Sequence, residues 1–134
     1  MATDRDLTFV IADDYPAVRE AVKTILEGQR FQVLGEASDG DEAVRLCRDL
    51  APDIAVLDFS MPRLNGLDAA RKIRMIHPNT KIIILTIHSG VPYLLESLVV
   101  GVSAFVTKSM AATTLLDAIE SVCRGEIYVR AAYK

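Results

Sequence analysis

The chain has 134 residues, 51% of them apolar and 25% charged, and its formal charge at pH 7 is -3. This size and composition predict one globular domain with a sizeable core. The slight negative charge, without any basic run, argues against direct binding to nucleic acid or to an anionic membrane. No apolar run reaches the roughly 18 residues of a membrane-spanning helix. The polar start of the chain has no leader pattern, so we expect a cytoplasmic protein.

Short apolar runs alternate five times with amphipathic stretches along the chain. The apolar runs predict strands at residues 7–12, 31–37, 54–57, 81–85 and 104–107. Helices are predicted from Pro16 to Gly28, from Asp39-Gly40 to Pro52, from Gly66 to His77, from about Pro92 onward, and from Ala112 to Arg124. Five βα units with short connections predict a parallel α/β sheet that is covered by helices on both faces.

Among doubly wound α/β folds, five strands favour the flavodoxin-like strand order 2-1-3-4-5, with five helices. In this order the first, third, fourth and fifth strands are consecutive neighbours. We therefore expect the polar residues at their carboxyl ends to meet at one edge of the sheet: Asp13-Asp14, Asp58, Thr86 and Lys108. The second strand lies at the margin of the sheet and offers no obvious functional group.

The run of residues 54–57 is continuously apolar and stops at Asp58. Such a run is typical of a strand that is buried on both faces, as in a parallel sheet. An isolated aspartate in this place most often caps the following helix. The polar side chains at three other strand ends favour a shared site instead, because open α/β sheets bind their ligands at the carboxyl ends of the strands.

Three carboxylates at one edge repel one another unless a cation lies among them. Because the expected ligands are oxygens, with no histidine or cysteine nearby, we predict Mg²⁺, with Mn²⁺ or Ca²⁺ as less favoured ions. Lys108 adds a positive charge, and Thr86 adds a hydroxyl donor. A carboxylate nucleophile, a divalent ion, a lysine and a hydroxyl together form a site suited to phosphoryl transfer.

This ordered set of residues resembles the receiver domain of bacterial two-component response regulators, which has the CheY-like form of the predicted fold. The resemblance covers essentially the whole chain. It implies that Asp58 accepts a phosphoryl group from a sensor histidine kinase in a Mg²⁺-dependent reaction. It also implies that Asp14 binds the ion directly, with Asp13 assisting and Asp58 and the backbone carbonyl of Ser60 as further ligands.

The resemblance assigns a switching role to three further positions. Thr86 and Lys108 would contact the phosphoryl oxygens, and Phe105 would change rotamer together with Thr86 on activation. Such a domain catalyses only its own phosphorylation and dephosphorylation, so we do not expect an enzyme with outside substrates. Its conformational switch would control an output, for which we expect transcription.

Three stretches resemble the NarL/LuxR (FixJ) type of regulator: DFSMPRLNGLD at residues 58–68, GVSAFVTKS at 101–109 and LLDAIESVCRGEIY at 115–128. Regulators of this type continue into a helix-turn-helix domain, through which alone they bind DNA. Only nine residues follow Gly125, far fewer than a domain requires. We therefore expect a receiver domain at residues 1–126 and the start of a linker to a missing effector at 127–134; a lone receiver is the alternative.

Two positions leave details of the site open. Many receivers have a cis proline after the lysine, whereas this chain has Ser109, so the isomer of the Lys108–Ser109 bond stays open. Lysine-serine is common in the NarL type and does not argue against function. His88 lies where side chains can affect access of the hydrolytic water, although a histidine of a surface loop is the simpler interpretation.

The predicted fourth helix is apolar on nearly all sides, at Tyr93, Leu94, Leu95, Leu98, Val99 and Val100. Either a partner or a second copy covers part of this surface, or the helix lies deeper in the fold than usual. The resemblance leads us to expect a homodimer on phosphorylation. The sequence does not indicate whether it would use this helix or the first and last helices.

The two cysteines, Cys47 and Cys123, fall on the apolar faces of predicted helices. We interpret them as buried free thiols in a reducing compartment. Neither belongs to a CxxC pair or has a histidine nearby, which argues against a metal site and against a nucleophile.

Three other functions compete with the phosphorylation switch. A phosphatase of the haloacid-dehalogenase type needs a second carboxylate two residues after its nucleophile, where this chain has Ser60. A flavodoxin-like cofactor binder needs a glycine-rich loop after the first strand, where Asp13 and Asp14 would repel phosphate. A receiver-shaped scaffold without chemistry would not need all five polar positions, and this chain has them all.

Overall fold

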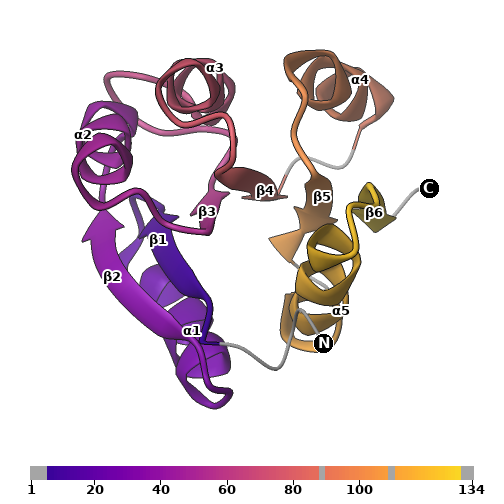
Figure 1. The fold of residues 1–134 in the computed structure, drawn as a ribbon. Helices are drawn as coiled ribbons and strands as arrows, with labels where there is room; N and C mark the ends of the chain where they lie inside the picture. Colours follow the sequence, from indigo (N-terminus) through magenta and orange to yellow (C-terminus); the bar gives the residue numbers. More distant parts are fainter. Residues whose placement is uncertain (1–5, 88–89, 109–110, 131–134) are drawn as a thin grey trace.

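The computed structural model describes residues 6–87, 90–108 and 111–130 of the chain, in which strands and helices alternate (Figure 1). The strands are β1 (Thr8–Ala12), β2 (Gln32–Ala37), β3 (Ile54–Leu57), β4 (Lys81–Thr86), β5 (Ala104–Thr107) and β6 (Tyr128–Arg130). The helices are α1 (Pro16–Glu27), α2 (Gly40–Leu50), α3 (Gly66–Ile76), α4 (Val91–Val100) and α5 (Ala111–Cys123). All strands pair in parallel in one sheet of order β2-β1-β3-β4-β5-β6.

The sheet separates two apolar cores. Helices α1 and α5 cover one face, and α2, α3 and α4 cover the other (Figure 1). In β3, Ile54 and Val56 belong to the core on the α1 side, whereas Ala55 and Leu57 belong to the other core. Because both faces of β3 are covered, its sequence is a continuous apolar run. In the described ranges, no helix has the length and apolar character that a membrane crossing needs.

Two helices next to the sheet edge begin at capping side chains. The Asp39 carboxylate accepts a hydrogen bond from the Glu42 backbone N–H at 2.8 Å and so caps α2. The Asn65 side chain accepts from the Asp68 N–H at 2.9 Å and caps α3. Such caps satisfy backbone donors that a helix leaves unpaired at its start. The helix after β3 is therefore capped by Asn65, and Asp58 remains available for another role.

The α/β class, the parallel sheet and the order of the first five strands are confirmed, but the predicted count of five strands is wrong. Strand β6 adds a sixth, because the chain turns at Gly125 (φ 80°) after α5 and Tyr128 pairs with Ala104 of β5. A strand of three residues is too short to show a period in the sequence. Residues 128–130 of the predicted linker segment thus belong to the sheet; an effector domain beyond it stays a prediction.

The two cysteines differ in burial. Cys47 is buried and free, and this burial raises the pKa of its thiol to about 12. Cys123, the last residue of α5, is only partly buried. The prediction of buried free thiols is therefore confirmed for Cys47 and needs correction for Cys123.

Candidate metal centre at the carboxyl edge of the sheet

Two aspartates extend neighbouring strands at the carboxyl edge of the sheet. Asp13 follows β1 and Asp58 follows β3, and their exposed fractions are only 3% and 5%. The Asp13 N–H donates to the Ala37 carbonyl at 3.0 Å, and the Asp58 N–H donates to the Ala12 carbonyl at 2.9 Å. These bonds continue the pairing of the strands by one residue. The backbone of both aspartates is therefore fixed by the sheet itself.

Asp14 completes a cluster of three carboxylates with Asp13 and Asp58. One oxygen from each of the three lies within 4.8 Å of the others. The Asp14 Oδ1 atom is buried and has no hydrogen-bond partner. A buried carboxylate oxygen without a partner is costly, and three negative charges at this spacing repel one another. An oxygen-only set of this kind fits a hard divalent cation such as Mg²⁺.

Lys108 joins the cluster from the end of β5. Its Nζ atom lies 2.7 Å from Asp13 Oδ2 and 3.4 Å from Asp58 Oδ2, and it lies 5.7 Å from the centre of the Tyr15 ring. The Tyr15 N–H donates to Asp13 Oδ1 at 2.9 Å, which orients this carboxylate. The lysine therefore bridges the two buried aspartates and offsets part of their repulsion.

The buried environment shifts the proton affinities of the site. Burial raises the pKa of Asp58 to about 6, and the charge of Asp13 adds to this rise, while Lys108 and the Ser60 backbone N–H oppose it. Burial alone would lower the pKa of Lys108, but its hydrogen bond to Asp13 and the charges of both aspartates raise it above the usual value. The lysine thus stays charged at neutral pH.

Mg²⁺ affinity should fall when the pH drops below about 6. A carboxyl with a raised pKa holds its proton below that pKa, so protons compete with the ion for Asp58. We expect calorimetric titration to give several-fold weaker Mg²⁺ binding at pH 5.5 than at pH 7.5. The Asp58→Asn variant should show a smaller change. Equal affinities of the unaltered protein at the two pH values would contradict this assignment.

Asp14→Asn should change stability and metal affinity in opposite directions. Without metal, the amide removes one charge from the cluster, so the free energy of unfolding should rise by about 1 kcal/mol. Mg²⁺ binding should weaken by about tenfold or more, because a ligand is lost. Urea denaturation with a chelator and calorimetric titration measure the two effects. Asp117→Asn, at an exposed position of α5, is the control, and a loss of metal-free stability in Asp14→Asn would contradict the prediction.

Thr86 and Phe105 are placed by β4 and β5 near the same edge. Both are fully buried, and Phe105 packs in the core on the α2–α4 side. Ser60 lies in the loop after Asp58, and its backbone N–H bonds to the Asp58 carboxylate. The contacts of Thr86 and Lys108 with a phosphoryl group, the rotamer change of Phe105 and the Ser60 carbonyl ligand stay predictions. His88 and Ser109 lie outside the described residues.

Two close approaches fix the loop of residues 59–65, which follows Asp58. A Cβ atom on Gly66 would lie 1.9 Å from the Asp58 carbonyl oxygen, and one on Gly40 would lie 1.9 Å from the Leu64 carbonyl oxygen. The Gly66 N–H also donates to the Phe59 carbonyl at 2.9 Å. The first residues of α2 and α3 therefore pack directly on the backbone of this loop.

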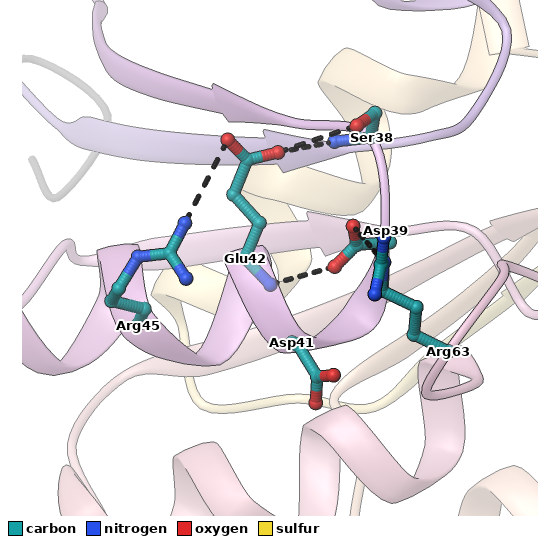
Figure 2. Close-up of a pocket in the computed structure, with 6 residues that line it drawn as sticks. All are labelled: Ser38, Asp39, Asp41, Glu42, Arg45 and Arg63. Atoms are coloured by element: carbon teal, nitrogen blue, oxygen red, sulfur yellow. Dashed lines mark hydrogen bonds and ion pairs between the residues drawn. The ribbon is translucent and has the colours of Figure 1, made fainter.

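An ion pair holds the same loop from the side of α2. Arg63 Nε lies 3.3 Å from Asp39 Oδ2, and both side chains line a polar pocket of about 390 Å³ (Figure 2). The pocket is lined by Ser38, Asp39, Asp41, Glu42, Arg45 and Arg63. None of these residues was predicted to bind metal or phosphate. The contacts drawn join Glu42 to Ser38, Asp39 and Arg45, and Asp39 to Arg63, at the start of α2.

Sequence reasoning missed the close approach at Gly40 and two charged residues: Arg19 of α1, which contacts Asp13, and Glu36 of β2, which contacts Arg19. Arg19 Nη1 donates to the Asp13 carbonyl oxygen at 2.6 Å. Glu36 lies in the marginal strand β2 and forms an ion pair with Arg19. The sequence signals were weak, because charged residues on helices and edge strands usually face solvent.

The chain matches the family model of the response regulator receiver domain over residues 9–120. It is 34% identical over 127 residues to the transcriptional regulatory protein DegU of Brevibacillus brevis, covering 94% of this chain and 54% of that protein. It is 36% identical over 124 residues to the response regulator UvrY of Escherichia coli, covering 92% of this chain and 57% of that protein. The chain thus spans little more than half the length of these relatives.

Solved structures agree with this assignment. A two-component response regulator of the LuxR family from Aurantimonas superposes with a TM-score of 0.86 at 35% identity, covering 92% of this chain and 89% of that one. The receiver domain of the putative regulator NarL from Mycobacterium tuberculosis gives 0.84 at 29% identity, covering 91% and 99%. The carboxylate cluster, the lysine that bridges Asp13 and Asp58, and these matches together show that the chain belongs to the response regulator receiver domain family, of the NarL/LuxR type.

Proposed function

We propose that this receiver domain accepts a phosphoryl group on the Asp58 carboxylate from a sensor histidine kinase, with Mg²⁺ bound at the cluster. The observation that carries the proposal is the cluster of Asp13, Asp14 and Asp58 at one sheet edge, with Lys108 paired to Asp13 and Asp58. The predicted ligands of the ion are these three aspartates and the Ser60 backbone carbonyl. Mn²⁺ would be accepted by the same oxygens.

The proposed reaction transfers a phosphoryl group from a histidine nitrogen of the kinase to a carboxylate oxygen of Asp58. An Asp58 oxygen attacks the phosphorus of a phosphohistidine, the P–N bond breaks, and the imidazole leaves with its electron pair. The bound ion supplies charge neutralisation on the phosphoryl oxygens. Lys108 adds a second positive charge, and Thr86 offers a hydroxyl donor on the β4 side. Water later hydrolyses the acyl phosphate. In this proposal the domain catalyses only its own phosphorylation and dephosphorylation.

The output is proposed from the relatives. DegU is named a transcriptional regulatory protein, and a solved assembly contains two RcsB dimers bound to two parallel DNAs. By analogy, phosphorylation of Asp58 would control transcription through a DNA-binding domain beyond this chain. Phosphorylation adds roughly -1.5 to -2 charges and three acceptor oxygens next to Lys108 and Thr86, which is enough to bias two arrangements of the adjoining loop.

Helix α4 offers a surface for a homodimer. Its residues Val91, Leu95, Leu98 and Val99 are exposed, up to 85% for Val99, and only Ser97 is fully buried. The alternative of a helix sunk deep in the fold is therefore wrong. Exposed apolar surface of this kind favours a protein contact. We propose that a second copy covers it after phosphorylation.

Leu95→Glu should prevent this dimer, because a charge in the middle of the apolar stripe of α4 cannot be buried without a partner. Light scattering of the phosphorylated protein should give twice the monomer mass for the unaltered chain and the monomer mass for the variant. Met75→Glu, which changes an exposed apolar residue of α3, should still dimerise. A doubled mass for Leu95→Glu would exclude α4 from the interface.

The test of phosphoryl acceptance is the intact mass after incubation with Mg²⁺ and acetyl phosphate. The unaltered chain and Asp117→Asn should gain one phosphoryl group, whereas Asp58→Asn should gain none. A chelator should abolish the gain. If no variant gained a phosphoryl group while the fold was intact, the scaffold function would replace this proposal. A gain in Asp58→Asn would mean that another side chain is the acceptor.

A further inference from the structure

Strand β2 reaches the metal centre through Arg19. The Arg19 side chain is only 19% exposed, and its Nε atom lies 3.5 Å from Glu36 Oε1 of β2. The Nη1 atom of Arg19 donates a hydrogen bond to the Asp13 main-chain carbonyl oxygen at 2.6 Å. That carbonyl belongs to the peptide that joins Asp13 to Asp14, so one hydrogen bond acts on both predicted metal ligands.

Two basic residues of α1, Arg19 and Lys23, contact the Glu36 carboxylate, one at each oxygen. Lys23, one helical turn after Arg19, lies 3.4 Å from the second carboxylate oxygen of Glu36. Glu36 therefore keeps Arg19 turned toward the sheet edge, and the planar guanidinium contacts the carboxylate and the carbonyl at once. Lys23 shares the acid, but the described contacts do not connect it to Asp13. We call Glu36 and Arg19 together the Glu36–Arg19 brace.

We propose that Arg19, held by Glu36, is a positioning residue for the Mg²⁺ site. By fixing the Asp13–Asp14 peptide, it keeps the partnerless Asp14 oxygen and the Asp13 carboxylate directed at the cluster with Asp58. Groups that orient metal ligands commonly change metal affinity by roughly 10–100-fold. The inference rests on the proposed function, because it deepens the assignment of the same site.

A positioning role and a simple charge effect predict opposite results. The positive charge of Arg19 near three carboxylates disfavours a second cation, so its removal alone would tighten Mg²⁺ binding. If Arg19 positions the peptide, its removal weakens binding in spite of the lost charge. If Arg19 only stabilises the fold, Mg²⁺ affinity stays the same while the free energy of unfolding falls.

The experiment is a calorimetric titration of Mg²⁺ into four proteins at pH 7.5, with circular dichroism as the check of folding. Arg19→Met should bind Mg²⁺ about tenfold more weakly than the unaltered chain. Arg19→Lys, which keeps the charge but loses the planar fork, should also be weaker. Lys23→Met, which removes a charge from the same Glu36 network, should stay within about twofold.

Unchanged or tighter binding by Arg19→Met, or by Arg19→Lys if the first variant does not fold, would overturn the positioning role. Equal weakening in Lys23→Met would also overturn it, because a side chain without a described contact to the Asp13–Asp14 peptide would then have the same effect as Arg19. These outcomes leave the acceptor function intact, since phosphoryl gain at Asp58 is measured separately. Failure of the unaltered chain to bind Mg²⁺ would instead overturn the metal site together with the brace.

Discussion

Gly66→Ala should lower the free energy of unfolding by about 2–3 kcal/mol or more. The added Cβ atom would lie 1.9 Å from the Asp58 carbonyl oxygen and 2.9 Å from the carbonyl carbon. These are backbone atoms that cannot rotate away as a flexible side chain does, so α3 or the loop must shift. Because the shift begins at Asp58 itself, the rate of Mg²⁺-dependent phosphorylation should fall as well.

Gly28→Ala is the matched control for this effect. Gly28 follows α1 in the right-handed helical conformation, with a φ of -68°. The nearest neighbour of a Cβ atom at this position would be the Thr24 carbonyl oxygen, at 3.4 Å. Its alanine variant should be neutral or more stable by up to about 1 kcal/mol, because the unfolded chain loses freedom. Urea denaturation measures the free energy of unfolding of both alanine variants. Equal transition midpoints for Gly66→Ala and Gly28→Ala would contradict the close packing at Gly66.

Lys108→Met should slow phosphorylation from acetyl phosphate by about 10²–10³-fold at saturating Mg²⁺. The ammonium group lies 3.4 Å from Asp58 Oδ2 and 2.7 Å from Asp13 Oδ2, with 13% of the side chain exposed. It is therefore placed to neutralise charge that develops on the transferred group. Methionine keeps the length and the apolar part of the side chain while removing the charge.

The comparison for Lys108→Met is Lys81→Met, at an exposed position of β4 on the opposite edge of the sheet. The rate of mass gain should match that of the unaltered chain in this control. A Lys108→Met protein that is folded by circular dichroism and phosphorylated at the unaltered rate would remove the lysine from the mechanism.

The layered fold was predictable because its strands are buried on both faces. Apolar runs such as residues 54–57 and 104–107 stand out from the amphipathic helices, and both ranges match strands of the structure. Strand β6 could not be predicted in the same way, because Tyr128–Arg130 is too short for a pattern and its stability comes from pairing with β5. The depth of α4 was also open, since its composition fits a buried helix as well as an exposed contact surface.

The meeting of Asp13, Asp14, Asp58 and Lys108 was predictable for a topological reason. Neighbouring parallel strands bring their carboxyl ends to one edge, so strand order is enough to place the residues that follow them. The Glu36–Arg19 brace depends instead on the rotamer of a long side chain between a helix and a strand, which no local pattern reveals. The packing at Gly66 likewise depends on the distance between α3 and the Asp58 backbone.

The most direct test of the central claim is to locate the phosphoryl group on the chain. Borohydride reduces an aspartyl acyl phosphate to homoserine and leaves free carboxylates unchanged, and tandem mass spectrometry of peptides then identifies the reduced position. After treatment with Mg²⁺ and acetyl phosphate, homoserine should appear at position 58 alone, and a chelator should prevent it. Homoserine at position 13 or 14, or at no position in a protein that has gained phosphoryl mass, would contradict Asp58 as the acceptor.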